Sequence, residues 1–386
     1  MLSVLFRGLL RKATLRPRNM IWYGKEGLCL SFRTRYNGGE SAVSKGGFSR
    51  MKRVLWAVIV LLVFSSWAFA APKKIGLILA TGGLGDKSFN DISYAGALRA
   101  SEELGVELDY VEPKAIAEYE GYQRDFASSG EYEIIVCIGF DQADALNKIA
   151  QEFPEQKFAI VDMVVNQPNV ASLLFKANEG GFLLGIAAAY MTKTGKIGIV
   201  GGMDIPLIRD FFLGFEEGVK WANTGAVVLP TVYVGGWADP TKGKELALSL
   251  IDQGCDVIWA AAGKSGLGAL EAAKERGVYA MGVDACQCYL GGHIFASLTK
   301  RVDVAVYETI KAAFAGTFQG GVFEKGVAEG WIGNCRFPEE EPLWEERFGF
   351  KHAVELPKEA MEKMLEAREK IAKGELRVPR PPEFGG

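Results

Sequence analysis

The sequence has few histidines and none of the common catalytic motifs. Only two of its 386 residues are His, the side chain that most often carries general acid–base catalysis near neutral pH. The nucleophile motif G-x-S-x-G, the zinc motif H-E-x-x-H, the P-loop and the dinucleotide fingerprint G-x-G-x-x-G are missing. Acid–base chemistry would have to depend on carboxylates or lysines, so we expect neither an enzyme nor a bound cofactor.

The main part of the chain also lacks a surplus of positive charge. Of the 44 Lys and Arg residues, 12 lie in residues 1–70, which hold only two acidic residues, Glu26 and Glu40. The remaining 32 basic and 45 acidic residues give residues 71–386 a net charge of about −13, although the whole chain sums to −3. Nucleic acids bind to clusters of positive charge, so we expect no nucleic-acid partner.

The apolar run at residues 54–64 is too short to span a membrane, which takes about 20 apolar residues. It follows the basic end Met51-Lys52-Arg53 and precedes Ala68-Phe69-Ala70, which places small residues before a cut after Ala70. These three parts are typical of a secretory signal. We therefore predict that residues 51–70 are a signal peptide, cleaved after Ala70, and that the protein lies in the periplasm. No Cys stands at the cut, so we expect no lipid anchor.

Residues 1–50 precede this signal and are rich in Arg, poor in acidic residues and without a sustained helical or strand period. Such a composition suits a transit peptide, or untranslated DNA that has been read as protein. We favour the second interpretation, because Lys45-Gly46-Gly47 can be encoded by AAAGGAGG, a ribosome-binding sequence. Residues 48–50 would then be a spacer, and translation would begin at Met51.

Beyond residue 73, apolar strand-like runs alternate with amphipathic segments. The runs lie at 74–80, 106–111, 133–138, 157–161, 196–200, 228–234, 256–260, 278–283 and 294–298. The amphipathic segments lie at 89–104, 118–129, 141–152, 179–192, 206–222, 241–253, 264–276, 302–315 and 357–373. This alternation with short connections predicts an α/β fold with parallel sheets and helices on both faces. We expect residues 336–356 to be irregular and residues 377–386 to be loose.

The alternation could form one barrel or two open sheets. Glycine-rich loops follow the strands of both halves, and an extra strand near residues 169–179 interrupts the rhythm, which favours two doubly wound lobes. A hinge would join the lobes, with the ligand cleft between them. We expect the first lobe to comprise residues 71–175 plus about 293–330, and the second to comprise residues 176–292 plus about 331–386.

The main part of the chain holds an odd number of cysteines: Cys137, Cys255, Cys286, Cys288 and Cys335. The first two lie in apolar strand-like runs, where a thiol packs as a small hydrophobic group. We expect a disulfide between Cys335 and either Cys286 or Cys288, which lie in one loop. Neither His293 nor His352 completes the spacing of a zinc site, so we expect no metal.

The glycine-rich loop within residues 73–91, KKIGLILATGGLGDKSFND, is the first candidate for a binding site. In open α/β sheets the ligand lies at the carboxyl ends of the strands. This loop carries Asp86, Ser88, Phe89 and Asn90. A second interpretation is that the glycines only form a tight turn and that Phe89 belongs to the core.

Four motifs occur in one order along the chain: GDKSFND at 85–91, VGGMDIPLIRDFFLGFEEGV at 200–219, the run from ADPTKGKE to VDACQ at 238–287, and SLTKRVD at 297–303. They resemble the basic membrane protein family of solute-binding proteins, which serve ABC importers. The resemblance covers residues 73 to about 330, with a weaker similarity at 357–379. It implies a type I periplasmic-binding-protein-like fold, a small-molecule ligand and an ABC permease in the inner membrane. We expect a monomer.

The better-understood members of this family are similar to a purine-nucleoside receptor, and the resemblance assigns roles to individual residues. Phe89 and Phe211 match the two rings that sandwich the base, and stacking on a base contributes about 1–3 kcal/mol. Asn90 and Asp141 match polar positions beside the purine edge.

The remaining matched positions concern the sugar. Asp284 and Lys300 match the pair that accepts from and donates to the ribose hydroxyls. Gly263 would allow close approach of the backbone to the ligand. Cys286 stands where the family more often has an acidic residue, so the contacts near Asp284 can differ.

Each matched residue also has a purely structural interpretation. Phe211 shares a helix with two further phenylalanines and could belong to the core. Asp141 could cap a helix, and Asp284 and Lys300 could be solvated charges. The weaker candidates for ligand contact are Asp86, Ser88, Asp162, Asp204 and Trp237.

The resemblance leads us to expect binding of a purine nucleoside. Riboflavin or another flat or small ligand remains an alternative, because Trp237 could reshape the pocket. A sensor that presents its ligand to a membrane receptor would use the same pocket, and adjacent permease and ATPase genes would favour import instead. A nucleoside hydrolase or phosphorylase would release free base.

Overall fold

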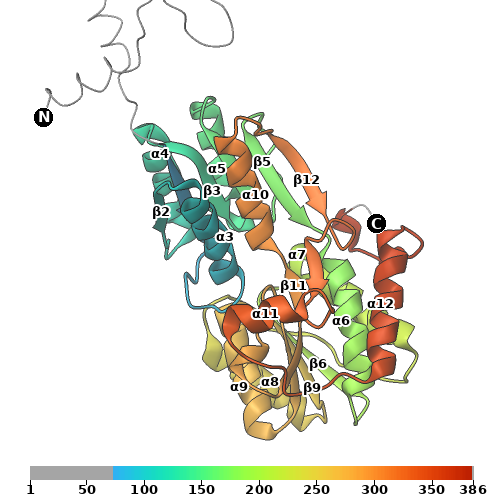
Figure 1. The fold of residues 1–386 in the computed structure, drawn as a ribbon. Coiled ribbons are helices and arrows are strands. Elements are labelled where there is room, and N and C mark those ends of the chain that lie inside the picture. Colours follow the sequence, from blue (N-terminus) through green and yellow to red (C-terminus); the bar gives the residue numbers. More distant parts are fainter. Residues whose placement is uncertain (1–72, 385–386) are drawn as a thin grey trace, which may run out of the picture. The chain divides into compact units, whose positions relative to one another are not determined.

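The computed structural model describes residues 73–384 (Figure 1). The predicted extension at residues 1–50, the signal peptide at 51–70 and the cleavage after Ala70 lie outside the described residues. The described chain forms two lobes, each built on a mainly parallel sheet with helices on both faces. This confirms the predicted α/β fold class.

The first lobe contains a six-stranded parallel sheet in the order β12-β5-β4-β3-β1-β2. Its strands are β1 (Lys74–Ile78), β2 (Leu108–Val111), β3 (Tyr132–Ile138), β4 (Lys157–Val161), β5 (Val170–Phe175) and β12 (Gly321–Lys325). Beyond Glu133 and Lys157 near their starts, the central strands β3 and β4 are apolar, as expected for strands with both faces covered. In β3, Ile134 and Val136 join one core cluster, whereas Ile135 and Cys137 join the other.

Four helices cover this sheet: α3 (Phe89–Leu104), α4 (Tyr119–Ser129), α5 (Ala143–Glu152) and α10 (Val302–Phe314). Helices α3 and α10 pack together, and so do α4 and α5. A short 3-10 turn, η2 (Phe140–Gln142), leads from β3 into α5.

The second lobe contains a seven-stranded sheet in the order β13-β11-β10-β9-β6-β7, with β8 also paired to β6. Its strands are β6 (Lys196–Gly201), β7 (Val227–Val228), β8 (Val232–Tyr233), β9 (Val257–Ala261), β10 (Tyr279–Gly282), β11 (Ile294–Lys300) and β13 (Ile332–Asn334). Strand β13 is antiparallel to β11, and the other paired strands run parallel. The 3-10 turn η3 (Cys288–Leu290) follows β10.

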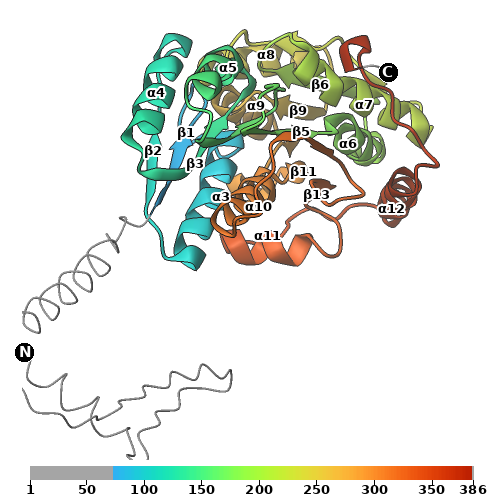
Figure 2. The ribbon, with the colours of Figure 1, turned by 90° about the horizontal axis from the view of Figure 1, so that it is seen from above.

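The helices of the second lobe form two packed pairs, α6 (Ala177–Met191) with α7 (Pro206–Ala222), and α8 (Pro240–Asp252) with α9 (Lys264–Arg276). Helix α12 (Lys358–Ala372) lies beside α6 (Figure 2). The α6–α7 contact is close because each helix places glycines at the crossing. A Cβ added at Gly181 would lie 2.1 Å from the carbonyl oxygen of Phe211, and one at Gly214 would lie 2.0 Å from that of Asn178. This packing fixes α7, which carries Phe211.

The chain crosses between the lobes at residues 175–177, 300–302 and 325–332. In Figure 1 the orange α10 and β12 therefore lie among the blue and green elements of the first lobe. The predicted lobe boundary near residue 293 is wrong for β11, which pairs with β10 in the second sheet. The chain enters the first lobe only after Lys300, because β11 must be complete before the crossing.

Two predictions about irregular segments are also corrected. Residues 336–356 contain a helix, α11 (Glu341–Phe348), whose Trp344 is buried. The tail beyond residue 377 is held in place by Arg380, which forms a two-fold ion pair at 3.0 Å with the buried carboxylate of Asp210. A charged pair at the end of the chain carries no hydrophobic period, so the sequence pattern did not indicate this anchor.

Candidate functional site

A pocket of about 720 Å³, counting its open mouth, lies where the carboxyl ends of the strands of both sheets meet. The first lobe contributes residues that follow β1, β3 and β4, and the second contributes residues of α7 and residues that end or follow β9, β10 and β11. This is the edge at which open parallel sheets bind ligands.

The structure brings most of the sequence-predicted residues together around this pocket. The lining includes all seven first-choice residues and three of the weaker candidates: Phe89, Asn90, Asp141, Phe211, Gly263, Asp284, Lys300, Asp86, Asp162 and Trp237. Two weaker candidates, Ser88 and Asp204, are not among the lining residues. Asp204, in the loop after β6, is exposed and pairs with Arg209 at 2.7 Å.

The two phenylalanines border the same small space. Phe89 is the first residue of α3, and Phe211 lies on the pocket side of α7. The Lys300 ammonium nitrogen is 4.9 Å from the ring centre of Phe89 and 5.7 Å from that of Phe211. Phe211 also packs on Trp259 with ring centres 6.4 Å apart, so it belongs to the core and to the pocket wall together.

Lys300 forms an ion pair with Asp162, one of the weaker candidates. Its ammonium group donates to both carboxylate oxygens of Asp162, at 2.7 and 2.5 Å, and both side chains are buried. Asp162 follows β4 of the first lobe and has a positive φ of 70°. The pair therefore joins the two lobes at the bottom of the pocket, and the opposite charge compensates the burial of each group.

Asp284 occupies the matching place after β10 in the second lobe, with a φ of 66°. The hydroxyl of Ser88, from the first lobe, donates to its carboxylate at 2.5 Å. Burial raises the pKa of Asp284 to about 6, although the nearby positive charge of Lys300 opposes the rise. Ser88 is thus a partner of a lining residue and does not line the pocket itself.

Asp86 has a structural role at the start of α3. Its carboxylate accepts hydrogen bonds from the backbone N–H groups of Ser88, Asn90 and Asp91, at 2.9, 2.8 and 3.2 Å. These are the free donors of a helix N-terminus, and their satisfaction stabilises the helix. Burial raises the pKa of Asp86, whereas these hydrogen bonds lower it.

Asn90 and Asp141 present polar atoms to the pocket. The Oδ1 atom of Asn90 accepts the backbone N–H of Ala80 at 2.9 Å, which leaves the side-chain amide N–H groups for a ligand. Asp141 caps neither η2 nor α5, whose N-caps are Gly139 and Gln142. Its carboxylate instead accepts from the Tyr119 hydroxyl at 3.2 Å, and burial raises its pKa.

Two residues that the sequence did not single out shape the site. Tyr119 is buried behind Asp141 and also accepts the backbone N–H of Thr81 at 2.9 Å. Lys264 reaches across from the second lobe and donates to the carbonyl oxygens of Gly82 at 2.8 Å and Leu84 at 3.3 Å. The position of Lys264, directly after the glycine that ends the β9 loop, could have indicated its role. Nothing in the sequence pattern distinguishes Tyr119 from a core residue.

The predicted disulfide is absent from the described chain, where all five cysteines are free and buried. The sulfur atoms of Cys288 and Cys335 lie 3.7 Å apart. This exceeds the S–S bond length of about 2.05 Å, so the prediction identified neighbouring thiols but not a bond.

These features define a class of protein. Two doubly wound lobes that enclose a pocket at their strand ends form the architecture of the solute-binding proteins of ABC transporters. A solved solute-binding protein of Aeropyrum pernix has this fold, with a TM-score of 0.71 and 34% identity over 80% of this chain and 94% of its own.

Residues 73–380 match the family described as "ABC transporter substrate-binding protein PnrA-like", and the chain belongs to this family. An uncharacterized lipoprotein of Pyrococcus abyssi is 38% identical over 68% of this chain and 69% of its own length. Basic membrane protein A of Borreliella burgdorferi is 36% identical over 69% of this chain and 80% of its own. The predicted resemblance to the basic membrane protein family is therefore confirmed.

Membership places the protein among substrate-binding proteins rather than enzymes, outside the cytoplasm. It implies a small-molecule ligand and an ABC permease as partners. Among residues 73–384, no helix combines the length and apolar character that crossing a bilayer requires.

Proposed function

We propose that this protein binds a purine nucleoside and delivers it to an ABC permease. The observation that supports this proposal is the meeting of Phe89, Phe211, Asp284 and Lys300 at one pocket between the lobes. Flat apolar faces and a few convergent polar groups suit a ligand that has an aromatic base and a sugar.

The base would lie against Phe89 and Phe211. Any nucleobase offers a π face, and stacking on aromatic side chains contributes about 1–3 kcal/mol per base. Asn90 can donate from its side-chain amide and Asp141 can accept, so the two could pair with the carbonyl and N–H groups of a purine edge. The choice between bases would depend on these two residues.

The sugar would lie near Asp284 and Lys300. The ammonium group of Lys300 has three N–H donors, and its pairing with Asp162 leaves capacity for a ribose hydroxyl. The carboxylate of Asp284 accepts from Ser88 and can accept further from a second hydroxyl. A ligand without hydroxyl groups in this position would leave the remaining hydrogen-bonding capacity of these buried groups unused, at a cost of about 1–3 kcal/mol.

The lobes would close over the ligand by rotation about the three crossings. Supporting contacts between the lobes include those of Lys264 with Gly82 and Leu84, and the 3.1 Å hydrogen bond from the Gln287 side-chain amide to the Lys87 carbonyl oxygen. Hinge closure of this kind is a common motion of two-lobed binding proteins.

Calorimetric titration tests the ligand directly. We expect saturable binding of guanosine, adenosine or inosine without release of free base, and at least tenfold weaker binding to the variant Asp284→Ala. Asp204→Ala is the matched control, because this carboxylate lies outside the pocket, and it should bind as the wild type does. Failure of all three nucleosides to bind at millimolar concentration would contradict the ligand assignment, and release of free base would contradict the transport role.

Riboflavin is the second candidate ligand, favoured by the large ring of Trp237 in the pocket lining. A Cβ added at Gly202 would lie only 2.2 Å from this ring, which shows how tightly Trp237 is held. Riboflavin binding that exceeds nucleoside binding in the same titration would replace the first assignment.

We further propose that the protein is a monomer exported by the signal at residues 51–70, with synthesis beginning at Met51. The mass of the protein isolated from its own cells shows where the mature chain begins, and so tests both the start site and the cleavage site. A mature chain that begins at residue 71 supports it, whereas a peptide from residues 1–50 would contradict it. A lipid-modified chain, as the name of the P. abyssi relative suggests for that protein, would replace the predicted free N-terminus.

A further inference from the structure

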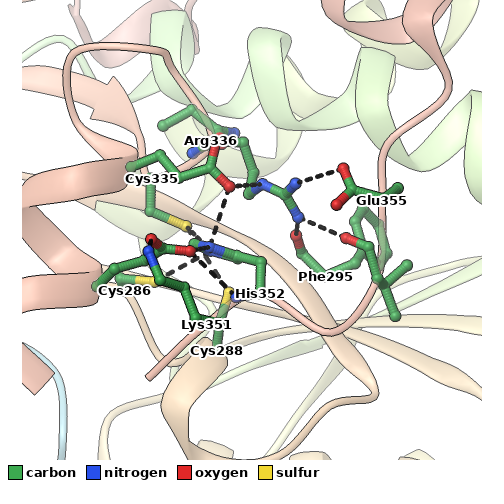
Figure 3. A network of polar contacts seen from close by, with 12 residues as sticks. Cys286, Cys288, Phe295, Cys335, Arg336, Lys351, His352 and Glu355 are labelled. Carbon is green, nitrogen blue, oxygen red and sulfur yellow. Dashed lines mark hydrogen bonds and ion pairs between the residues drawn. The ribbon is translucent and has the colours of Figure 1, made fainter. Parts of the chain in front are cut away.

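Three cysteines and one histidine of the second lobe converge on one point (Figure 3), and none of them lines the pocket. The sulfur atoms of Cys286, Cys288 and Cys335 and a ring nitrogen of His352 all lie within 4.8 Å of one another. The residues come from the segment after β10, from the end of β13 and from the segment after α11. Three separate segments thus direct four metal-binding side chains to one point.

The spacing of these atoms fits a tetrahedral metal ion. The distance from Cys288 Sγ to Cys335 Sγ is 3.7 Å, and His352 Nε2 lies 3.9 Å from the sulfur atoms of both Cys286 and Cys335. Zinc binds thiolates at about 2.3 Å and imidazole at about 2.0–2.1 Å, so the edges of its tetrahedron measure roughly 3.5–3.8 Å. A set of three Cys and one His is a common ligand set of structural zinc sites.

The histidine is oriented as metal-bound histidines usually are. Its Nδ1 atom lies 3.1 Å from the carboxylate of Glu341 and 3.3 Å from that of Glu345. A proton on Nδ1, shared with these carboxylates, leaves the lone pair of Nε2 directed towards the sulfur atoms. Such carboxylate–histidine pairs fix the tautomer and the ring orientation at zinc sites.

The surroundings also hold the cysteine side of the cluster in place. The backbone N–H of Ser297 donates to Cys335 Sγ at 3.2 Å. The guanidinium of Arg336 donates to the carbonyl oxygens of Phe295 at 3.1 Å and Val354 at 2.7 Å, which ties the segment around His352 to strand β11 (Figure 3). Three thiolates and one Zn²⁺ sum to a single negative charge, and the Arg336 cation lies beside them.

We propose that Cys286, Cys288, Cys335 and His352 bind one Zn²⁺ ion in a structural site. The ion fastens the segment between β13 and α12 to the loop after β10. That loop also carries Asp284 and Gln287, whose side-chain oxygen accepts the backbone N–H of Val283 at 3.1 Å. The metal therefore supports the loop that supplies one carboxylate of the pocket, without touching the ligand.

Elemental analysis of the exported protein, purified without chelators or added metal, tests this proposal independently of any ligand. We expect about one equivalent of zinc per chain. A protein whose metal has been replaced by Co²⁺ should show the visible absorption of tetrahedral cobalt thiolate. Zinc below about a tenth of an equivalent, together with a Cys288–Cys335 disulfide in peptide maps, would overturn the proposal.

Two variants separate the metal site from a disulfide. Cys286→Ser removes one metal ligand but leaves a Cys288–Cys335 bond free to form, so loss of zinc from this variant supports coordination. Cys255→Ser is the control, because this buried cysteine lies outside the cluster, and it should retain the full equivalent. Equal zinc content in both variants would contradict the assignment. If Cys286→Ser does not fold, titration of the wild-type thiols with a mercurial should release zinc in step with three cysteines.

Discussion

The two lobes supply equivalent positions to the pocket but place different chemistry there. Strand order β2-β1-β3-β4-β5 in the first lobe matches β7-β6-β9-β10-β11 in the second. The fourth strand of each set, β4 or β10, is followed by an aspartate with a positive φ, Asp162 at 70° and Asp284 at 66°. Such a backbone is costly for a residue other than glycine and is concentrated at functional sites.

Each of these aspartates has its partner in the other lobe. Asp162 forms an ion pair with Lys300, whereas Asp284 receives a neutral hydroxyl from Ser88. The first carboxylate is therefore compensated in charge, and the second remains a buried acid that a ligand can satisfy. The comparison separates a fixed contact between the lobes from a position reserved for the ligand.

The largest effect on stability is expected when one partner of the Lys300–Asp162 ion pair is removed. Lys300→Met leaves Asp162 buried without a counter-charge, which typically lowers the free energy of unfolding by about 3–5 kcal/mol. Denaturant unfolding measures this change. The double variant Lys300→Met with Asp162→Asn should recover a large part of the loss, because residue 162 then carries no charge. A double variant as unstable as the single one would mean that packing, not charge, dominates.

The next effect concerns the two rings, which occupy the helices that follow the first strand of each lobe. Phe89→Leu and Phe211→Leu keep the apolar bulk but remove the π face, so each should weaken nucleoside binding tenfold or more, given stacking of about 1–3 kcal/mol. Titration calorimetry of each variant gives the affinity. Unchanged affinity in both would show that the rings only support the walls of the pocket.

A smaller effect is expected in the pH dependence of stability. The pKa of Asp284 is about 6 in the folded protein, above its ordinary value of 3.8. The folded state thus binds this proton more tightly than the unfolded state, and stability from this group falls as pH rises from about 4 to about 6. The fall should be on the order of 2 kcal/mol, since one pH unit corresponds to about 1.4 kcal/mol.

Unfolding curves of the wild type and of Asp284→Asn between pH 4 and 7 isolate this contribution. The other buried carboxylates with a raised pKa, such as Asp86 and Asp141, remain in both proteins and cancel in the difference. Parallel profiles for the two proteins would contradict the assignment of Asp284 as the uncompensated acid.

The smallest effect is expected at Asp204, in the loop that follows the first strand of the second lobe. Its counterpart Asp86 in the first lobe is buried and caps α3, whereas Asp204 forms an exposed ion pair with Arg209. Exposed pairs contribute about 0–1 kcal/mol, so Asp204→Ala should change neither ligand affinity nor stability by more than this. A loss of affinity measured by titration would show that Asp204 takes part in ligand binding.

The sequence predicted the fold class and the family because both depend on local patterns. Alternating apolar runs and strand-end loops indicated the parallel sheets, and the motifs around Phe89, Phe211 and Lys300 indicated the family. The pairing of Lys300 with Asp162 could not be predicted, because it depends on how the two sheets face each other. Short strands such as β12 and β13 depend on their neighbours for stability and carry too few residues for a clear period.

The cysteine cluster shows a different limit. Cys286 and Cys288 were visible as a pair, and Cys335 as their neighbour, but His352 follows a helix, α11, that the sequence did not indicate. The spacing from Cys335 to His352 along the chain fits no familiar zinc motif, and the sequence pattern did not show that a helix lies between them. Only the folded path of residues 336–356 brings the imidazole to the sulfur atoms.

The order in which the chain contributes segments to the two lobes determines when each lobe can finish folding. The first lobe lacks α10 and β12 until the chain up to Lys325 is present, and until then β5 has a free edge and α3 has no cover. Gly96 of α3 would even clash with Asp303 of α10 if it carried a Cβ, at 2.4 Å from the carbonyl oxygen. A fragment that ends before residue 302 should therefore be a poor soluble product, and a translocating chain must emerge almost entirely before either half can mature.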